Sequence, residues 1–145
     1  MKKLSLVLLL WLYACCLVFG EGSSSRMSLF NEALGTVGKR VPSGWIENDG
    51  SFWKSRDFAI GKEFTMANVN RNIVENAQVG CAFANARTQI VWLKESFDML
   101  IADKWELVME DSDSWVLMKG DIFAIGVSDV TDGTPMASVV FQQWK

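Results

Sequence analysis

Apolar residues recur at helical spacing in two segments of the chain. In the longer segment they predict a helix from Gln89 to about Ala102 with Thr88 at its N-cap, and they are Ile90, Leu93, Phe97, Leu100 and Ile101. The shorter segment predicts a helix from Leu29 to Val37 with Ser28 at its N-cap, through Phe30, Ala33, Leu34 and Val37. A stretch with strand-like patterns follows each predicted helix.

The stretch after the second helix contains four short apolar or alternating runs. They predict strands at residues 105–109, 115–119, 122–128 and 136–144. Turn-forming residues separate these runs, at Glu110 to Ser114, at Gly120-Asp121 and at Asp129 to Pro135. The order in this half is therefore one helix and then four strands.

The stretch after the first helix has the same order with weaker signals. Asn48-Asp49-Gly50 predicts a hairpin between short strands at residues 45–47 and 51–55. Phe58 to Thr65 is expected to be the third strand, and Gln78 to Ala84 the fourth. Met66 to Asn76 holds four asparagines with little periodicity, and this predicts a loop.

Matching segments suggest that the two halves are copies of one unit. Phe-Ala-Ile-Gly occurs at residues 58–61 and 123–126, each time four residues after a lysine. A shift of 60 residues superposes Trp45 on Trp105, and Ala77-Gln78-Val79 on Ala137-Ser138-Val139. The same shift matches three positions of the predicted helices, namely Phe30 with Ile90, Ala33 with Leu93 and Val37 with Phe97. We therefore predict repeats at about residues 28–86 and 87–145.

These elements predict an α+β fold, a tandem duplication of a helix followed by a four-stranded antiparallel unit. Both helices are expected on one face of the sheet or sheets, because each has one apolar side to bury. Phe58 and Ile60, like Phe123 and Ile125, are expected to point inward from equivalent core strands.

One face of the predicted sheet is a candidate contact surface for a partner. A shift of 65 residues matches Phe52 and Lys54 with Leu117 and Lys119, and Trp115 shares the face of the latter two. Since that face carries both lysines, we expect it to face solvent. Large apolar groups with lysines at the rim are typical of a binding surface, so the candidate partner-binding residues are Phe52, Lys54, Trp115, Leu117 and Lys119.

The first twenty residues have the pattern of a secretory signal. Lys2 and Lys3 precede an apolar run from Leu4 to Leu12, and Gly20 offers a small residue before a cleavage point. Residues 21–27 then form a polar spacer that we expect to be flexible, before a single domain at residues 28–145. A second interpretation is a lipoprotein box at residues 12–15, with a lipid attached to Cys15. The chain is thus expected to be secreted or periplasmic, or else lipid-anchored in an envelope.

Composition narrows the chemistry that the mature chain can perform. Without the two signal lysines, the net charge moves from −3 to about −5, which argues against nucleic acid as a partner. The chain has no histidine, so Ser–His and Cys–His nucleophiles are excluded. Cys81 sits between Gly80 and Ala82 in an apolar strand, as expected for a small buried residue. The acidic loops match no calcium motif, and we expect neither a metal nor a cofactor.

The sequence therefore indicates a non-catalytic binding protein whose partner is another protein, engaged through an exposed sheet face or its loops. In architecture alone, the tandem layout resembles that of the β-lactamase inhibitory proteins, although the disulfides of that family are absent and only the repeat layout is shared. Three alternatives stay open. They are a carrier with a pocket lined by Phe97, Met99, Met118 or Phe123, an enzyme that uses a carboxylate pair, and a lipid-anchored structural protein.

Overall fold

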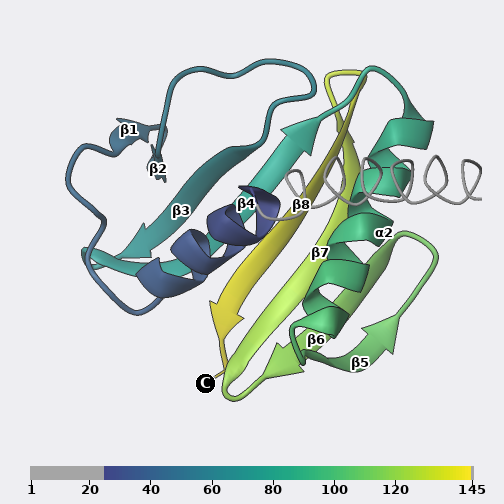
Figure 1. The fold of residues 1–145 in the computed structure, drawn as a ribbon. Helices are drawn as coiled ribbons and strands as arrows, with labels where there is room; N and C mark the ends of the chain where they lie inside the picture. Colours follow the sequence, from purple (N-terminus) through teal and green to yellow (C-terminus); the bar gives the residue numbers. More distant parts are fainter. Residues whose placement is uncertain (1–24, 145) are drawn as a thin grey trace, which may run out of the picture.

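The computed structural model describes residues 25–144, which form an antiparallel sheet with two helices on one of its faces (Figure 1). The first helix spans residues 25–36 and is followed by β1 (Ile46–Asn48), β2 (Ser51–Trp53), β3 (Phe64–Asn70) and β4 (Ile73–Ala82). The second helix, α2 (Ala86–Ala102), is followed by β5 (Glu106–Glu110), β6 (Ser114–Lys119), β7 (Ile122–Thr131) and β8 (Thr134–Gln143). The predicted α+β class and the order of one helix and four strands, twice, are confirmed.

The two units join through their last strands into one eight-stranded sheet. The strand order is β1-β2-β3-β4-β8-β7-β6-β5, so β4 and β8 lie in the middle and β1 and β5 form the edges. At the β4–β8 junction, Val79 is the direct partner of Val139. These are residues that the 60-residue shift superposes. The same shift places Trp45 and Trp105 each one residue before the first strand of its unit.

The doubled Phe-Ala-Ile-Gly does not take part in this symmetry. Residues 123–126 lie in β7, whereas residues 58–61 lie in the connection between β2 and β3, where Phe58 is 51% and Ile60 62% exposed. The prediction of equivalent core strands is therefore wrong. Gly61 has a φ of 83° and donates its N–H to the carbonyl of Ala82, so the first copy forms a turn at the end of β4.

The predicted loop at residues 66–76 is also wrong, because this segment forms the hairpin of β3 and β4. Its two-residue turn consists of Arg71 and Asn72, with φ of 53° and 68°. Left-handed residues suit such turns because their twist matches that of the strands. Neither residue is glycine, so the usual sequence signal is missing. The predicted turn at Asp49-Gly50, by contrast, is confirmed by the pairing of Asn48 with Ser51.

Both helices begin earlier than their predicted caps. Asn85, not Thr88, caps α2, and its side-chain oxygen accepts the N–H of Thr88 at 3.0 Å. Ser28 lies inside the first helix, which already includes residues 25–27 of the predicted spacer. The predicted signal at residues 1–20, Cys15 and residues 21–24 lie outside the described residues.

The buried side of α2 is rotated from the predicted stripe. Leu93 and Leu100 are buried as expected, but Ile90 is 62% and Ile101 40% exposed. Their places in the core are taken by Gln89, Trp92 and Ser96. Gln89 donates to the backbone carbonyls of Asp129 and Met136, at 2.8 and 2.6 Å, so its buried amide binds the turn region of β7 and β8.

The core lies between the helices and the sheet, and Phe141 of β8 is at its centre. Its ring packs against Phe30 of the first helix, with centroids 5.8 Å apart, and against Trp105 after α2, at 5.7 Å. Phe30 also meets Trp92 of α2 edge-on at 6.5 Å. Both units thus contribute aromatic rings to one continuous core.

Candidate functional site

The sheet face chosen from the sequence as solvent-exposed is the face that the helices cover. Trp115 is only 5% exposed and Leu117 is fully buried. Phe97 of α2 packs against Trp115 with ring centroids 5.6 Å apart. The expected exposure of this face is therefore wrong, and Trp115 and Leu117 contact the core in place of a partner.

The two lysines of that face connect the sheet to the helices. Lys54 Nζ lies 2.7 Å from a carboxylate oxygen of Glu32, in the first helix. Lys119 Nζ donates to the backbone carbonyl of Asp103, the C-cap of α2, at 2.8 Å. Phe52 pairs across the sheet with buried Ala67, on the same covered face. Lys54 and Lys119 therefore lie at the edge of the core, where they contact the helices, and they do not identify a solvent-facing surface.

The opposite face of the sheet carries no described helix, and we call it the helix-free face (Figure 1). Strand pairing aligns one residue from each of the eight strands across it. We call this line the apolar row, and its members are Ile46, Trp53, Met66, Gln78, Val140, Ile125, Val116 and Met109. Seven of the eight are apolar. A sheet face left to water normally carries polar side chains, so the apolar row points to a contact surface.

A second line of neighbours runs beside the apolar row, and its first part is polar. We call this part the amide row, and it consists of Asn48, Ser51, Asn68, Asn76 and Gln142. Ser51 Oγ donates to Asn68 Oδ1 at 2.9 Å, and Asn68 Nδ2 donates to Asn76 Oδ1 at 2.8 Å. These bonds fix the amide positions and leave further donors and acceptors for a ligand.

Aromatic rings stand at both ends of the helix-free face. Phe64 lies between Trp53, at 5.1 Å, and Phe58, at 5.5 Å. At the other end, Phe123 meets Trp144 edge-on at 5.2 Å, and Trp144 is 66% exposed. Large rings with free surface are the side chains that most often dominate binding energy.

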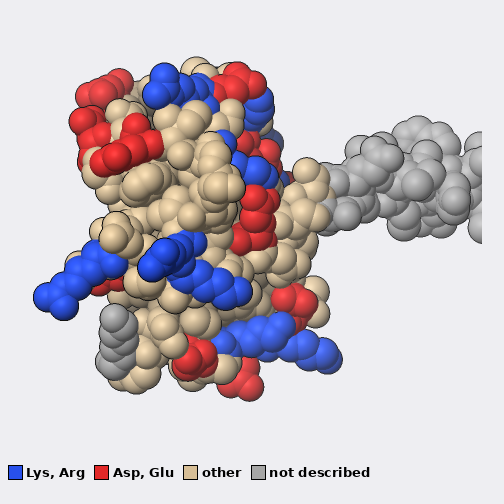
Figure 2. All heavy atoms as spheres, turned by 90° about the vertical axis from the view of Figure 1, so that its left-hand side faces the viewer, with Lys and Arg blue, Asp and Glu red and all other residues tan. Residues whose placement is uncertain are grey.

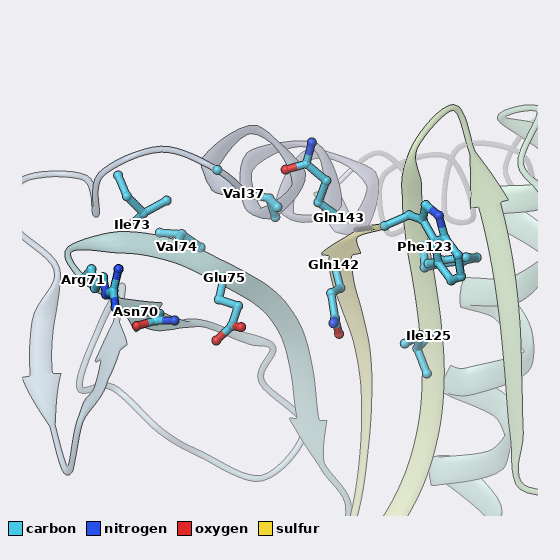
Figure 3. Close-up of a pocket in the computed structure, with 12 residues that line it drawn as sticks. Val37, Asn70, Arg71, Ile73, Val74, Glu75, Phe123, Ile125, Gln142 and Gln143 are labelled. Carbon is cyan, nitrogen blue, oxygen red and sulfur yellow. The ribbon is translucent and has the colours of Figure 1, made fainter.

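A hollow of about 690 Å³ lies where Phe123 and Gln142 approach the β3–β4 turn (Figure 3). Ile125 and Gln142 line its sheet side, and Arg71 and Glu75 stand across from them. The hollow combines an apolar wall with amide and charged groups. It could therefore receive one side chain of a partner that docks on the face.

The alternation of apolar residues did not by itself separate the two faces of the sheet. In β6, Trp115 and Leu117 alternate with Val116 and Met118, so each side has two large apolar residues. In β7, Phe123 and Ile125 carry the bulk while Ala124 and Gly126 face the helices. The small residues were the available clue, because close helix packing needs space above the sheet.

The residues proposed for an interior ligand pocket lie on opposite sides of the sheet. Met118 and Phe123 pair with each other on the helix-free face. Phe97 and Met99, in contrast, belong to α2 and pack against the core. These four residues therefore do not enclose one cavity between helices and sheet.

Cys81 is 1% exposed, and its thiol is poorly suited to chemistry. Burial raises the pKa of this thiol from 9.0 to about 11, and the carboxylate of Glu63 adds to the effect. The guanidinium of Arg26 and the N–H of Gly61 act in the opposite direction with smaller effect. The thiol stays protonated at neutral pH, and a thiol is a weak nucleophile.

The raised pKa predicts a loss of stability between pH 9 and pH 11. The unfolded thiol ionises near pH 9 while the folded one keeps its proton, so rising pH favours the unfolded chain by up to about 3 kcal/mol. Urea unfolding of the chain and of Cys81→Ala, followed from pH 8 to pH 11, isolates this contribution. The difference in unfolding free energy should be constant up to about pH 8 and then shift in favour of the variant as the pH rises toward 11. Parallel curves would contradict the prediction.

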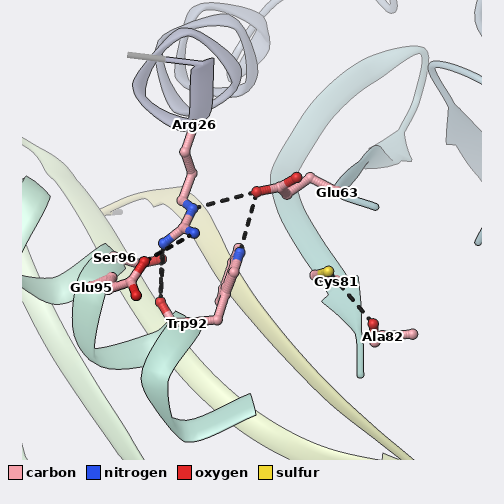
Figure 4. Close-up of polar contacts among 7 residues, drawn as sticks. All are labelled: Arg26, Glu63, Cys81, Ala82, Trp92, Glu95 and Ser96. Carbon is pink, nitrogen blue, oxygen red and sulfur yellow. Dashed lines mark hydrogen bonds and ion pairs between the residues drawn. The ribbon is translucent and has the colours of Figure 1, made fainter. Parts of the chain in front are cut away.

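The most connected polar cluster surrounds Arg26, in the first helix (Figure 4). Its Nε lies 3.5 Å from Glu63 Oε1, within ion-pair range but without the geometry of a hydrogen bond. Its Nη atoms reach Glu95 and the carbonyl of Trp92, each at 3.3 Å, and the guanidinium lies 4.9 Å from the Trp92 ring. The side chain is 11% exposed, so the cluster fastens the first helix to α2 and is structural.

Within residues 25–144, no group of three or more His, Cys, Asp or Glu side chains is placed so that it could hold a metal ion. The helices of this part of the chain are also not long and apolar enough to cross a membrane. The helix-free face is therefore the candidate site that the described residues support best.

Comparison of the chain with protein-family models, curated proteins and solved structures found no match. The architectural resemblance to the β-lactamase inhibitory proteins gains no support from these comparisons.

Proposed function

We propose that this chain is an exported, non-catalytic binding protein and that it docks a folded protein partner on its helix-free face. The apolar row is the observation that carries the proposal. It crosses all eight strands, a span of about 34 Å at roughly 4.8 Å per strand. That length suits a standard protein–protein interface better than a small-molecule site.

The chemistry of the face supports the same conclusion. Burying the apolar row supplies the driving force, and the aromatic groups at either end, Trp53 with Phe64 and Phe123 with Trp144, supply anchor residues. The amide row gives orientation, because its fixed donors and acceptors reward a partner with matching groups. An apolar surface beside polar groups is the usual composition of such an interface.

Site-directed photocrosslinking tests the proposal. A photoreactive amino acid in place of Val140, in the middle of the apolar row, is expected to crosslink to one folded protein from the environment of the source organism. The matched control carries the same group at Ile90, which is 62% exposed on the outer side of α2. Ile90 should give no such product.

A charge on the same face provides the second measurement. Val140→Lys is expected to weaken binding of the crosslinked protein at least tenfold, because burying an unpaired ammonium is costly. Its unfolding free energy should stay within about 1 kcal/mol of the parent, since the lysine stands on an open face. Equal products from both crosslinking positions, a product made of two copies of this chain, or unchanged binding by Val140→Lys would each reject the proposal.

A further inference from the structure

The edge strand β5 differs from the other strands in its exposure. All five of its residues are exposed. Its apolar residues Leu107, Val108 and Met109 are 49%, 54% and 59% exposed. Met109 closes the apolar row, while Leu107 pairs with Leu117 on the other side of the sheet. Apolar surface therefore continues from the helix-free face around the β5 edge.

As an edge strand, β5 has one side of its backbone paired with β6, and on the other side it has no neighbouring strand among residues 25–144. Unpaired N–H and C=O groups along a strand are a template for an added strand. An extended peptide that takes this place gains backbone hydrogen bonds, and its side chains read the neighbouring residues. The backbone of β5 thus offers affinity, and the exposed residues offer selectivity.

The charges around β5 select one class of added strand. Glu106 and Glu110 stand at its two ends, and Asp111 and Asp113 follow in the next loop. Lys104 is the one basic residue in the segment from 104 to 118. Three of these acids also border a hollow of about 350 Å³ against α2, whose charged lining consists of Asp98, Glu110, Asp111 and Asp113 with Lys94 as the one basic residue. The field at this edge favours a cation and disfavours a second copy of this acidic edge.

The other edge of the sheet has neither feature. β1 has three residues, and Glu47 is its one acidic residue. Figure 2 looks onto this side of the molecule and shows basic and acidic side chains interspersed. β1 therefore serves as the internal control for β5.

We infer that β5 accepts, as a ninth strand, an extended basic segment of the protein partner. This inference rests on the proposed function in one respect, namely that the partner is a protein. It does not require that the partner docks on the helix-free face. The short length of β5, its bulge and its glutamates limit indiscriminate pairing. The same glutamates stabilise a strand that brings lysine or arginine to them.

The bulge also defines the spacing of the basic residues. Val108 has no partner on β6, so Glu106 lies opposite Met118, and Glu110 lies opposite Trp115. Met118 and Trp115 point to different faces of the sheet, and the two glutamates do the same. Since side chains alternate along a strand, the two basic residues must be an odd number of positions apart. On β6, the partners of the two glutamates, Met118 and Trp115, are three residues apart. We therefore expect the two basic residues of the added strand to be three positions apart, with apolar residues between them.

The test uses synthetic peptides and the full chain. A peptide with a Lys-Val-Val-Lys centre is expected to bind with amide shifts and slowed hydrogen exchange confined to β5 and its flanks. Three matched peptides should bind at least about fivefold more weakly, one with glutamate in place of lysine, one with a third valine between the lysines, and one N-methylated on alternate amides. Equal binding of the two lysine spacings, or no binding by any peptide, would overturn the inference.

Charge reversal supplies the reciprocal arm. The double variant Glu106→Lys with Glu110→Lys should lose the lysine peptide and bind the glutamate peptide, whereas Glu47→Lys on β1 should behave as the parent. Reversal that left the preference for lysine unchanged would overturn the inference. Val140→Lys should keep the peptide while it loses the folded partner. Peptide binding thus tests the β5 inference, and binding of the folded partner tests the proposed function of the helix-free face, so that either one can fail without the other.

Discussion

Replacing Phe141 by alanine is expected to lower the free energy of unfolding by about 3–5 kcal/mol. The ring is fully buried and lies between Phe30 and Trp105, so its loss removes contacts with both units at once. Alanines at 77 and 124 flank it on the neighbouring strands and cannot fill the space. Urea denaturation followed by tryptophan fluorescence measures the change.

The adjacent residue is the matched control for this experiment. Val140 belongs to the helix-free face, and Val140→Ala is expected to cost no more than about 1 kcal/mol. Phe141→Ala should also lower the cooperativity between the two halves, because its ring packs against the first helix through Phe30 and against Trp105 of the second unit. Equal losses at the two positions would mean that the helices do not cover the face assigned to them.

Gly126→Ala is expected to destabilise the fold by about 3 kcal/mol, at the upper end of the cost of overpacking. A Cβ at this position would lie far inside van der Waals contact of the Trp115 ring. That ring is 5% exposed and Phe97 of α2 packs against it, so moving the ring away from a new Cβ would disturb its packing against the helix. The change is measured by the same denaturation experiment.

Gly80→Ala is the control, because a Cβ there also overlaps a ring, that of Phe64. Phe64 lies on the half-exposed helix-free face and can rotate toward solvent, so the expected cost is about 1 kcal/mol. Trp115→Leu should restore part of the stability of Gly126→Ala, since the smaller side chain makes room for the methyl group. A Gly126→Ala loss no larger than that of Gly80→Ala would contradict the close packing of Trp115.

The second half of the chain could be predicted well because its local signals agree with one another. Gly120-Asp121 and the acidic loop after β5 separate runs that become β5, β6 and β7 with shifts of one to three residues. The segment that became α2 has apolar spacing over several turns. Where propensity, periodicity and turn residues indicate the same element, tertiary packing has little left to decide.

The first half could be predicted only in part, for identifiable reasons. Arg71 and Asn72 form a left-handed turn without glycine, so the β3–β4 hairpin looks like an asparagine-rich loop. Those asparagines bond to one another across the strands, as Asn68 does to Asn76. Polar residues in a strand carry no apolar alternation, and their pairing becomes visible only when the strands are adjacent.

By itself the sequence determined the class, the count of strands and the 60-residue relation that pairs Val79 with Val139. Only the tertiary structure decided which face the helices cover. Both faces of β6 and β7 are apolar, and periodicity gives the alternation of side chains but not its direction. Ala124 and Gly126 are the small residues on the covered side of β7, and the Trp115 ring of β6 fills the space over Gly126, so the apolar row lies on the other side. The position of the proposed binding surface therefore depends on how the helices pack against the sheet. The residue pattern of an individual strand does not specify that packing.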